Sequence, residues 1–66
     1  MTPAEFRAAL DRLGQTQAGA ARLLGVDART VRRWACDERA VPEPVRRVLL
    51  ACERYPDLVP LLLAWE

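Results

Sequence analysis

The chain has 66 residues and a formal net charge of +1, with 52% hydrophobic and 29% charged residues. This length suits one small domain, and the apolar content argues against intrinsic disorder. With no histidine and two cysteines the sequence does not favour a zinc site, and it offers no nucleophile–base pair or glycine-rich phosphate loop. We therefore expect neither an enzyme nor a metal ion or other cofactor.

The sequence also gives an expected location. It shows neither a signal peptide nor an apolar run long enough to span a bilayer, since the segment 58–65 is far too short. A cytoplasmic protein without a membrane partner is the expectation. Cys36 and Cys52 are then expected to be free thiols, because disulfides are rare in the cytosol.

The N-terminal segment predicts a helix. Thr2-Pro3-Ala4-Glu5 has the pattern of a capping box, with proline at the first helical position. Phe6, Leu10 and Leu13 recur at helical spacing and form its buried stripe. Gly14 ends the helix.

Two helices joined by a tight turn are predicted next. Thr16 can cap the first of them, about Gln17–Leu24, and Gly25 provides the left-handed backbone that a sharp turn requires. Asp27 can cap the second, about Ala28–Cys36. The inward positions of this helix-turn-helix are small or apolar: Ala20, Ala21, Leu24, Val26, Val31 and Trp34.

Two further helices are predicted after a polar loop. Pro42-Glu43-Pro44 suits the first turn of a helix that ends at Tyr55-Pro56. The buried stripe of that helix comprises Val45, Val48, Leu49 and Cys52. Asp57 can cap a short last helix over 57–66. No strand pattern occurs, so we predict an all-α fold, a compact bundle of about five short helices in one domain spanning residues 1–66.

Positive charge is unevenly distributed along the chain. Residues 1–28 are neutral overall, residues 29–47 hold six arginines against three acids, and residues 48–66 hold one arginine against three acids. The excess lies on the second helix of the helix-turn-helix and on the segment that follows it. Such an asymmetry is typical of a DNA-binding face.

Residues 16–36 resemble the helix-turn-helix of the lambda-repressor/Cro-like family, the XRE-type regulators of bacteria and phages. The resemblance is carried by Gln17, Ala21, Leu24-Gly25-Val26, Thr30-Val31 and Trp34, and it extends over about Phe6 to Leu58. It departs at Gly19, where the family often has Glu, and in the loop 36–39, which lacks the usual glycine. The resemblance implies a lambda-repressor-like DNA-binding domain whose second motif helix enters the major groove.

The exposed face of the helix 28–36 supplies the candidate base contacts. At 100° per residue, Arg29 and Arg33 lie opposite the core positions Val31 and Trp34. Arginine can pair bidentately with guanine, and an alanine at the helix start can touch a thymine methyl group. The candidates are Ala28, Arg29, Arg32 and Arg33, and the alternative for them is a merely solvated helix face.

Candidate contacts to the DNA backbone lie beside this face. The resemblance implies such a contact for Gln17, and an amide at a helix N-terminus suits a phosphate. The full set is Thr16, Gln17, Thr30 and Arg39, although capping alone explains Thr16. Arg46 and Arg47 are expected to be solvated or to pair with nearby acids.

The C-terminal helix 57–66 is expected to be a dimerisation element. One domain reads only a few base pairs, and a two-fold dimer places two recognition helices about 34 Å apart on a palindromic operator. A helix this small cannot hide all of its apolar side chains against its own domain. The expected interface comprises Leu58, Leu61, Leu62, Leu63 and Trp65, the alternative being that part of this set only closes the monomer core.

The sequence therefore predicts a sequence-specific regulator that binds double-stranded DNA and takes no small-molecule ligand. A small unit with this resemblance fits a dimeric repressor or autorepressor of a phage or mobile-element operon, of the Cro-like or anti-CRISPR-associated type. The alternative is an antitoxin or protein-interaction module of the same fold, in which DNA binding is secondary or lost. Binding to DNA discriminates between the two.

Overall fold

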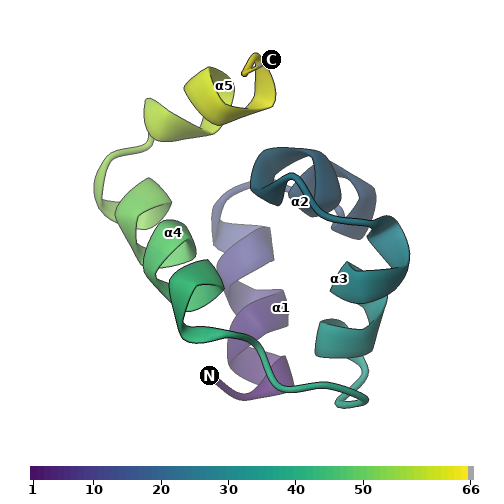
Figure 1. Cartoon of the computed structure of the whole chain (residues 1–66). Coiled ribbons are helices and arrows are strands. Elements are labelled where there is room, and N and C mark those ends of the chain that lie inside the picture. Colours follow the sequence, from purple (N-terminus) through teal and green to yellow (C-terminus); the bar gives the residue numbers. More distant parts are fainter. Residues whose placement is uncertain (66) are drawn as a thin grey trace.

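Five helices make up the fold over residues 1–65, the part of the chain that the computed structural model describes (Figure 1). They are α1 (Pro3–Arg12), α2 (Gln17–Leu24), α3 (Ala28–Ala35), α4 (Glu43–Arg54) and α5 (Leu58–Leu63). No strand occurs within residues 1–65, so the predicted all-α fold of five short helices is confirmed. The fifth helix is shorter than the expected 57–66, and Glu66 lies outside the described residues.

The first three helices begin where the sequence predicts, because each starts with a side chain that accepts a backbone hydrogen bond. Thr2 Oγ1 accepts from the Glu5 N–H at 3.1 Å, and the Glu5 carboxylate accepts from the Thr2 N–H at 2.8 Å, which completes the capping box. Thr16 caps α2 by accepting from the Gly19 N–H at 3.0 Å, and Asp27 caps α3 in the same manner. These caps determine where α2 and α3 start, and so the geometry of the turn between them.

The first three helices also end alike, in a reverse turn that passes through the left-handed backbone region. In α1 and α2 the residues at this point are Gly14 and Gly25, both with a φ of +68°. After α3 it is Asp37, with a φ of +61°, and the next N–H group, that of Glu38, donates to the Arg33 carbonyl at 2.9 Å. Asp37 therefore occupies the conformation for which glycine is the usual residue.

The main core is built from α1, α2, α3 and α4. Phe6, Val31 and Leu49 are fully buried, and they come from α1, α3 and α4 respectively. The Phe6 and Trp34 rings meet edge to face, with their centroids 5.9 Å apart and their planes at 84°. Val31 and Trp34 thus anchor α3 as predicted, and the opposite side of α3 is left facing outward.

α5 packs against α2 and α4, and two residues on those helices are buried outside the main core. Leu23 of α2 is 4% exposed and Cys52 of α4 is fully buried. The sequence placed Leu24 inward, yet Leu24 is only half-buried beside the main core. The difference has a physical reason, because α5 gives α2 a second covered side that local periodicity does not reveal.

The predicted cap of the fifth helix is wrong. Asp57 has helical backbone angles, with φ −63° and ψ −17°, and its side chain accepts no capping hydrogen bond. A capping side chain needs an extended backbone at its own residue. Here the chain turns earlier, since the Leu58 N–H already donates to the Tyr55 carbonyl at 3.0 Å.

Candidate nucleic-acid interface

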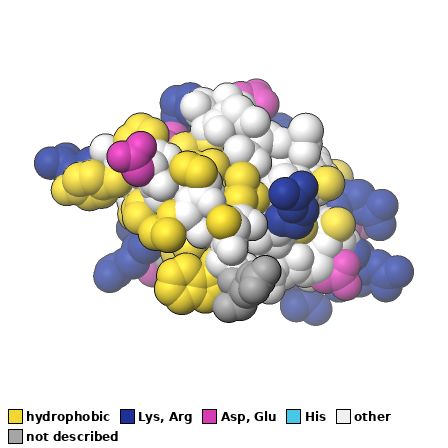
Figure 2. All heavy atoms as spheres, turned by 90° about the horizontal axis from the view of Figure 1, so that it is seen from above, with side chains coloured by type: hydrophobic (Ala, Val, Ile, Leu, Met, Phe, Trp, Pro, Cys, Tyr) yellow, Lys and Arg dark blue, Asp and Glu magenta, His cyan; other side chains and the backbone are white. Residues whose placement is uncertain are grey.

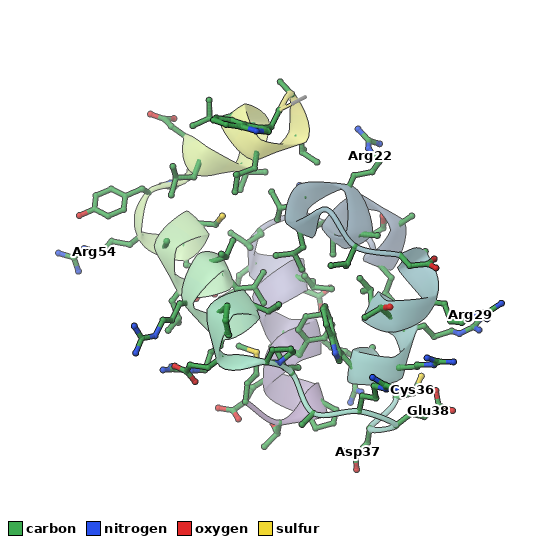
Figure 3. The ribbon with its side chains drawn as sticks, in the orientation of Figure 1. Arg22, Arg29, Cys36, Asp37, Glu38 and Arg54 are labelled. Carbon is green, nitrogen blue, oxygen red and sulfur yellow. The ribbon has the colours of Figure 1, made fainter. Side chains whose placement is uncertain are left out.

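α3 turns its arginines away from the core. Arg29 and Arg32 are exposed and Arg33 is half-buried, whereas Val31 and Trp34 on the other side are buried. In Figure 3 the Arg29 side chain extends outward from α3, away from the other helices. All four predicted base-contacting residues lie on α3 outside the core: Ala28, Arg29, Arg32 and Arg33.

Among the described residues, no acidic partner neutralises the arginines of α3 or Arg39 in the loop after it. Within residues 1–65, the ion pairs that form involve none of Arg29, Arg32, Arg33 and Arg39. Their guanidinium groups keep their N–H donors for an external partner. A planar fork of donors suits the O6 and N7 atoms of guanine or the oxygens of a phosphate.

The arginines of α4, in contrast, are neutralised locally. Nη2 of Arg46 lies 2.5 Å from Oε1 of Glu43, and Nε of Arg47 lies 3.3 Å from the same oxygen. These hydrogen bonds lower the pKa of Glu43 from its ordinary value of 4.5 to about 2, and the bond to Glu43 raises the pKa of Arg46. Of the two alternatives expected for Arg46 and Arg47, solvation or pairing with nearby acids, the structure shows pairing with Glu43.

Acidic residues border the arginine face at both ends of α3. Asp27 at the start is engaged in the helix cap, and Asp37 and Glu38 follow the end of the helix (Figure 3). The positive face is therefore a short strip over residues 29–33 and not a broad basic surface. The eight residues of α3 span roughly 12 Å, a length that covers only a few base pairs of a groove.

Three of the four residues predicted to contact the DNA backbone, Thr16, Gln17 and Arg39, line two separate concavities, and Thr30 lines neither of them. One, of about 260 Å³, is lined by Thr16 and Gln17 at the start of α2 and by Arg7 of α1. The other, of about 380 Å³, lies near the start of α1 and includes Arg39. Gln17 and Arg39 are exposed, Thr16 is exposed but used as a cap, and Thr30 is half-buried on α3.

Arg7 belongs to this region although the sequence did not predict a role for it. Its Nη1 donates to the main-chain carbonyl of Ala35 in the last turn of α3. Its side chain also lines the concavity that contains Gln17. The hydrogen-bond partner is a backbone carbonyl 28 residues away, so no local pattern signals the contact.

A second surface of interest is apolar and lies at the α5 end of the molecule. Trp65 is 73% exposed, Tyr55 58% and Leu61 53%. We call these three residues the C-terminal apolar surface. Figure 2 views the molecule from this end and shows hydrophobic side chains gathered on it. The other residues of the predicted interface are half-buried: Leu58, Leu62 and Leu63.

The described residues also include two cysteines and several acids that could in principle be reactive or bind a metal ion. Both cysteines are free thiols, Cys36 exposed and Cys52 buried, and burial raises the pKa of the Cys52 thiol. No three acidic, cysteine or histidine side chains within residues 1–65 gather closely enough to hold a metal ion. No helix in that range has the length and apolar character needed to cross a membrane.

Comparison with known proteins found no matching protein-family model, no matching curated protein and no matching solved structure. The resemblance of residues 16–36 to the lambda-repressor/Cro-like family therefore rests on the residues that carry it.

Proposed function

We propose that the protein is a sequence-specific regulator of transcription that binds double-stranded DNA and acts as a repressor. The observation that carries this proposal is the unpaired arginine face of α3, held outward by the buried anchors Val31 and Trp34. A helix with one buried face and one outward arginine face, preceded by another helix across a tight turn, is the arrangement that places side chains in a major groove.

The proposed roles follow from position. Arg29, Arg32 and Arg33 read base edges, and Ala28 contacts a thymine methyl group. Gln17 and Arg39 bind phosphates on either side of the groove, with smaller contributions from Thr16 and Thr30. In this arrangement the arginines of α3 determine which site is bound, and the flanking residues determine how firmly.

A homodimer on a palindromic operator is part of the proposal. Its interface is the C-terminal apolar surface, with Leu58, Leu62 and Leu63 at its border. Arg54, whose guanidinium lies 5.8 Å from the centre of the Tyr55 ring, and Asp57, two residues after Tyr55, have opposite charges, so this region offers complementary charges to a second copy. Two copies read about twice as many base pairs as one.

The test is a selection of binding sites from random double-stranded DNA, followed by band shifts with the enriched site. We expect enrichment of a palindromic sequence whose half-sites are separated by about one helical turn. The matched control is the Arg29→Ala/Arg33→Ala double variant, which removes two face arginines and should fail to enrich the same site. Equal binding of every sequence, or no binding, contradicts the proposal.

A protein-interaction module, such as an antitoxin that masks a partner, is the second candidate. The exposure of Trp65 and Leu61 favours it, because such a surface suits a protein partner as well as a second copy. A folded protein that binds no DNA in the selection, yet depends on Trp65 to associate with another chain, supports this candidate over the regulator.

A further inference from the structure

Arg7 makes a contact between two helices. It lies on α1 and its guanidinium donates to the carbonyl of Ala35, the last residue of α3, which is 2% exposed. The last four carbonyls of a helix have no partner within the helix, and a cation there also interacts favourably with the helix dipole. Arg7 therefore provides, from a different helix, a hydrogen-bond donor for a carbonyl at the end of α3.

The neighbouring residues strengthen this junction. Phe6, next to Arg7, packs edge to face on Trp34, next to Ala35. Two consecutive residues of α1 thus hold two consecutive residues of α3. The hydrogen bond adds a directional contact to the packing of the rings, because hydrogen bonds weaken steeply when the angle at the hydrogen falls below about 120°. The guanidinium is accordingly the directional part of the junction.

The end of α3 also anchors the loop that carries a candidate phosphate contact. The Arg33 carbonyl accepts from the Glu38 N–H at 2.9 Å and from the Arg39 N–H at 3.3 Å. Arg7 lines the concavity at the start of α2 as well, beside Gln17. One side chain therefore lies between the start of α2 and the end of α3, and within residues 1–65 it forms no ion pair with a carboxylate.

We propose that Arg7 is a positioning residue that holds the C-terminal end of α3 against α1. It thereby fixes the orientation of Arg29 and Arg33, and it does so without contacting DNA itself. The consequence for site discrimination rests on the proposed function, whereas the effect on the end of α3 does not.

The first experiment needs no DNA and measures amide hydrogen exchange by NMR. Arg7→Met removes the guanidinium and keeps an apolar stem, and Arg12→Met is the matched control, since Arg12 is also on α1 but pairs with Glu53 of α4. We expect the Glu38 and Arg39 amides to exchange roughly tenfold faster in Arg7→Met, and not in Arg12→Met. Arg7→Lys should restore part of the protection, because an ammonium can donate to the same carbonyl.

The Val26 amide, which donates to the Ala21 carbonyl, serves as the reference for opening elsewhere in the fold. Unchanged protection of Glu38 and Arg39 in Arg7→Met overturns the proposal. An equal loss of protection at Val26 overturns it too, because it shows a general loss of stability. If Arg7→Met does not fold, Arg7→Lys is measured against wild type, and the same local loss to a smaller degree is required.

The second experiment compares affinity for the selected DNA site with affinity for a scrambled duplex, as a function of salt. Arg7→Met should reduce the ratio of the two affinities by roughly tenfold and leave the salt dependence on scrambled DNA unchanged. A retained ratio with a salt slope smaller by about one identifies a phosphate contact and overturns the positioning role. If wild type binds no DNA, the proposed function fails and the exchange experiment alone decides the role of Arg7.

Discussion

Asp37 shows how a single residue can carry a conformational cost. Its φ of +61° lies in the left-handed region, which is disfavoured for every residue with a Cβ because the Cβ approaches the backbone too closely. We predict that Asp37→Gly increases the free energy of unfolding by about 1 kcal/mol, because aspartate tolerates this conformation only in part. Urea unfolding followed by circular dichroism measures the change.

Asp37→Ala is the matched control for this substitution. Alanine removes the same carboxylate as glycine but keeps a Cβ and lacks the local hydrogen bonding that helps aspartate in this region. Its stability should fall below wild type. If Asp37→Gly and Asp37→Ala change the stability in the same direction, the effect belongs to the lost charge and the conformational explanation is wrong.

The arginine face makes a second prediction at the scale of residues. Arg29→Ala or Arg33→Ala should weaken binding to the selected site by about 1–3 kcal/mol each and relax the preference at one base pair, because a bidentate contact to a base is lost. Arg39→Ala should weaken binding to all DNA sequences alike, since phosphate contacts carry no sequence information. Arg47→Ala, which removes an exposed arginine already paired with Glu43, is the control for charge alone. Wild-type binding by both α3 variants contradicts the assigned face.

At the scale of helices, the first turn of α4 has a pH-dependent contact. Arg46 and Arg47 hold the pKa of Glu43 at about 2, below its ordinary value of 4.5. A depressed pKa in the folded state stabilises the fold above the unfolded value, and this stabilisation disappears as the pH falls towards the folded value. The melting temperature of wild type should therefore decrease between about pH 4.5 and pH 2.

Glu43→Gln tests this prediction, because glutamine does not titrate. The decrease in melting temperature over the same pH range should be smaller in this variant, with a remainder from Glu5, whose pKa is lowered by its hydrogen bonds with Thr2. Arg46→Gln removes the main hydrogen-bond donor and should flatten the profile in the same way. If the melting temperature of Glu43→Gln falls with pH as steeply as that of wild type, the contacts of Glu43 with Arg46 and Arg47 do not cause the acid sensitivity.

The starts of the helices were predictable to the extent that their causes are local. The Thr2, Thr16 and Asp27 caps each involve residues within three positions, and all three form as expected. Asp57 is an aspartate like Asp27, but its own backbone is helical. The chain has already turned there, because the Leu58 N–H donates to the Tyr55 carbonyl. A cap depends on the backbone conformation that precedes the helix, and the residue type alone does not determine it.

At the scale of the whole molecule, the arginine face of α3 could be predicted from the sequence, but the tertiary contacts around α2 and α3 could not. Helical periodicity places Arg29 opposite Val31 without any knowledge of the fold. The burial of Leu23 under α5 and the contact of Arg7 with the Ala35 carbonyl depend on helices that are distant in sequence. The orientation of α3 therefore depends on tertiary contacts, whereas the side chains on its outer face follow from the local sequence.

The C-terminal apolar surface leads to a prediction about dimerisation. Trp65 and Leu61 are 73% and 53% exposed, so their burial by a second copy is favourable. A standard interface covers about 800 Å² per partner. That is under a fifth of the 4532 Å² that the protein exposes, and three side chains cover only part of it. We therefore expect a weak dimer in free solution that is strengthened on a palindrome, where the two half-sites hold the copies together.

Charged substitutions separate dimerisation from DNA binding. Trp65→Glu or Leu61→Glu should remain helical and monomeric, bind an isolated half-site like wild type, and lose affinity for the full palindrome. Leu50→Glu is the matched control, because Leu50 is also an exposed leucine, at 43%, but lies in the groove between α1 and α4 and away from this surface. Light scattering and band shifts on the same preparations measure both properties. A wild-type protein that stays monomeric at tens of micromolar, both free and on the palindrome, excludes the dimer. Equal losses in Leu50→Glu and Trp65→Glu exclude the C-terminal apolar surface as its location.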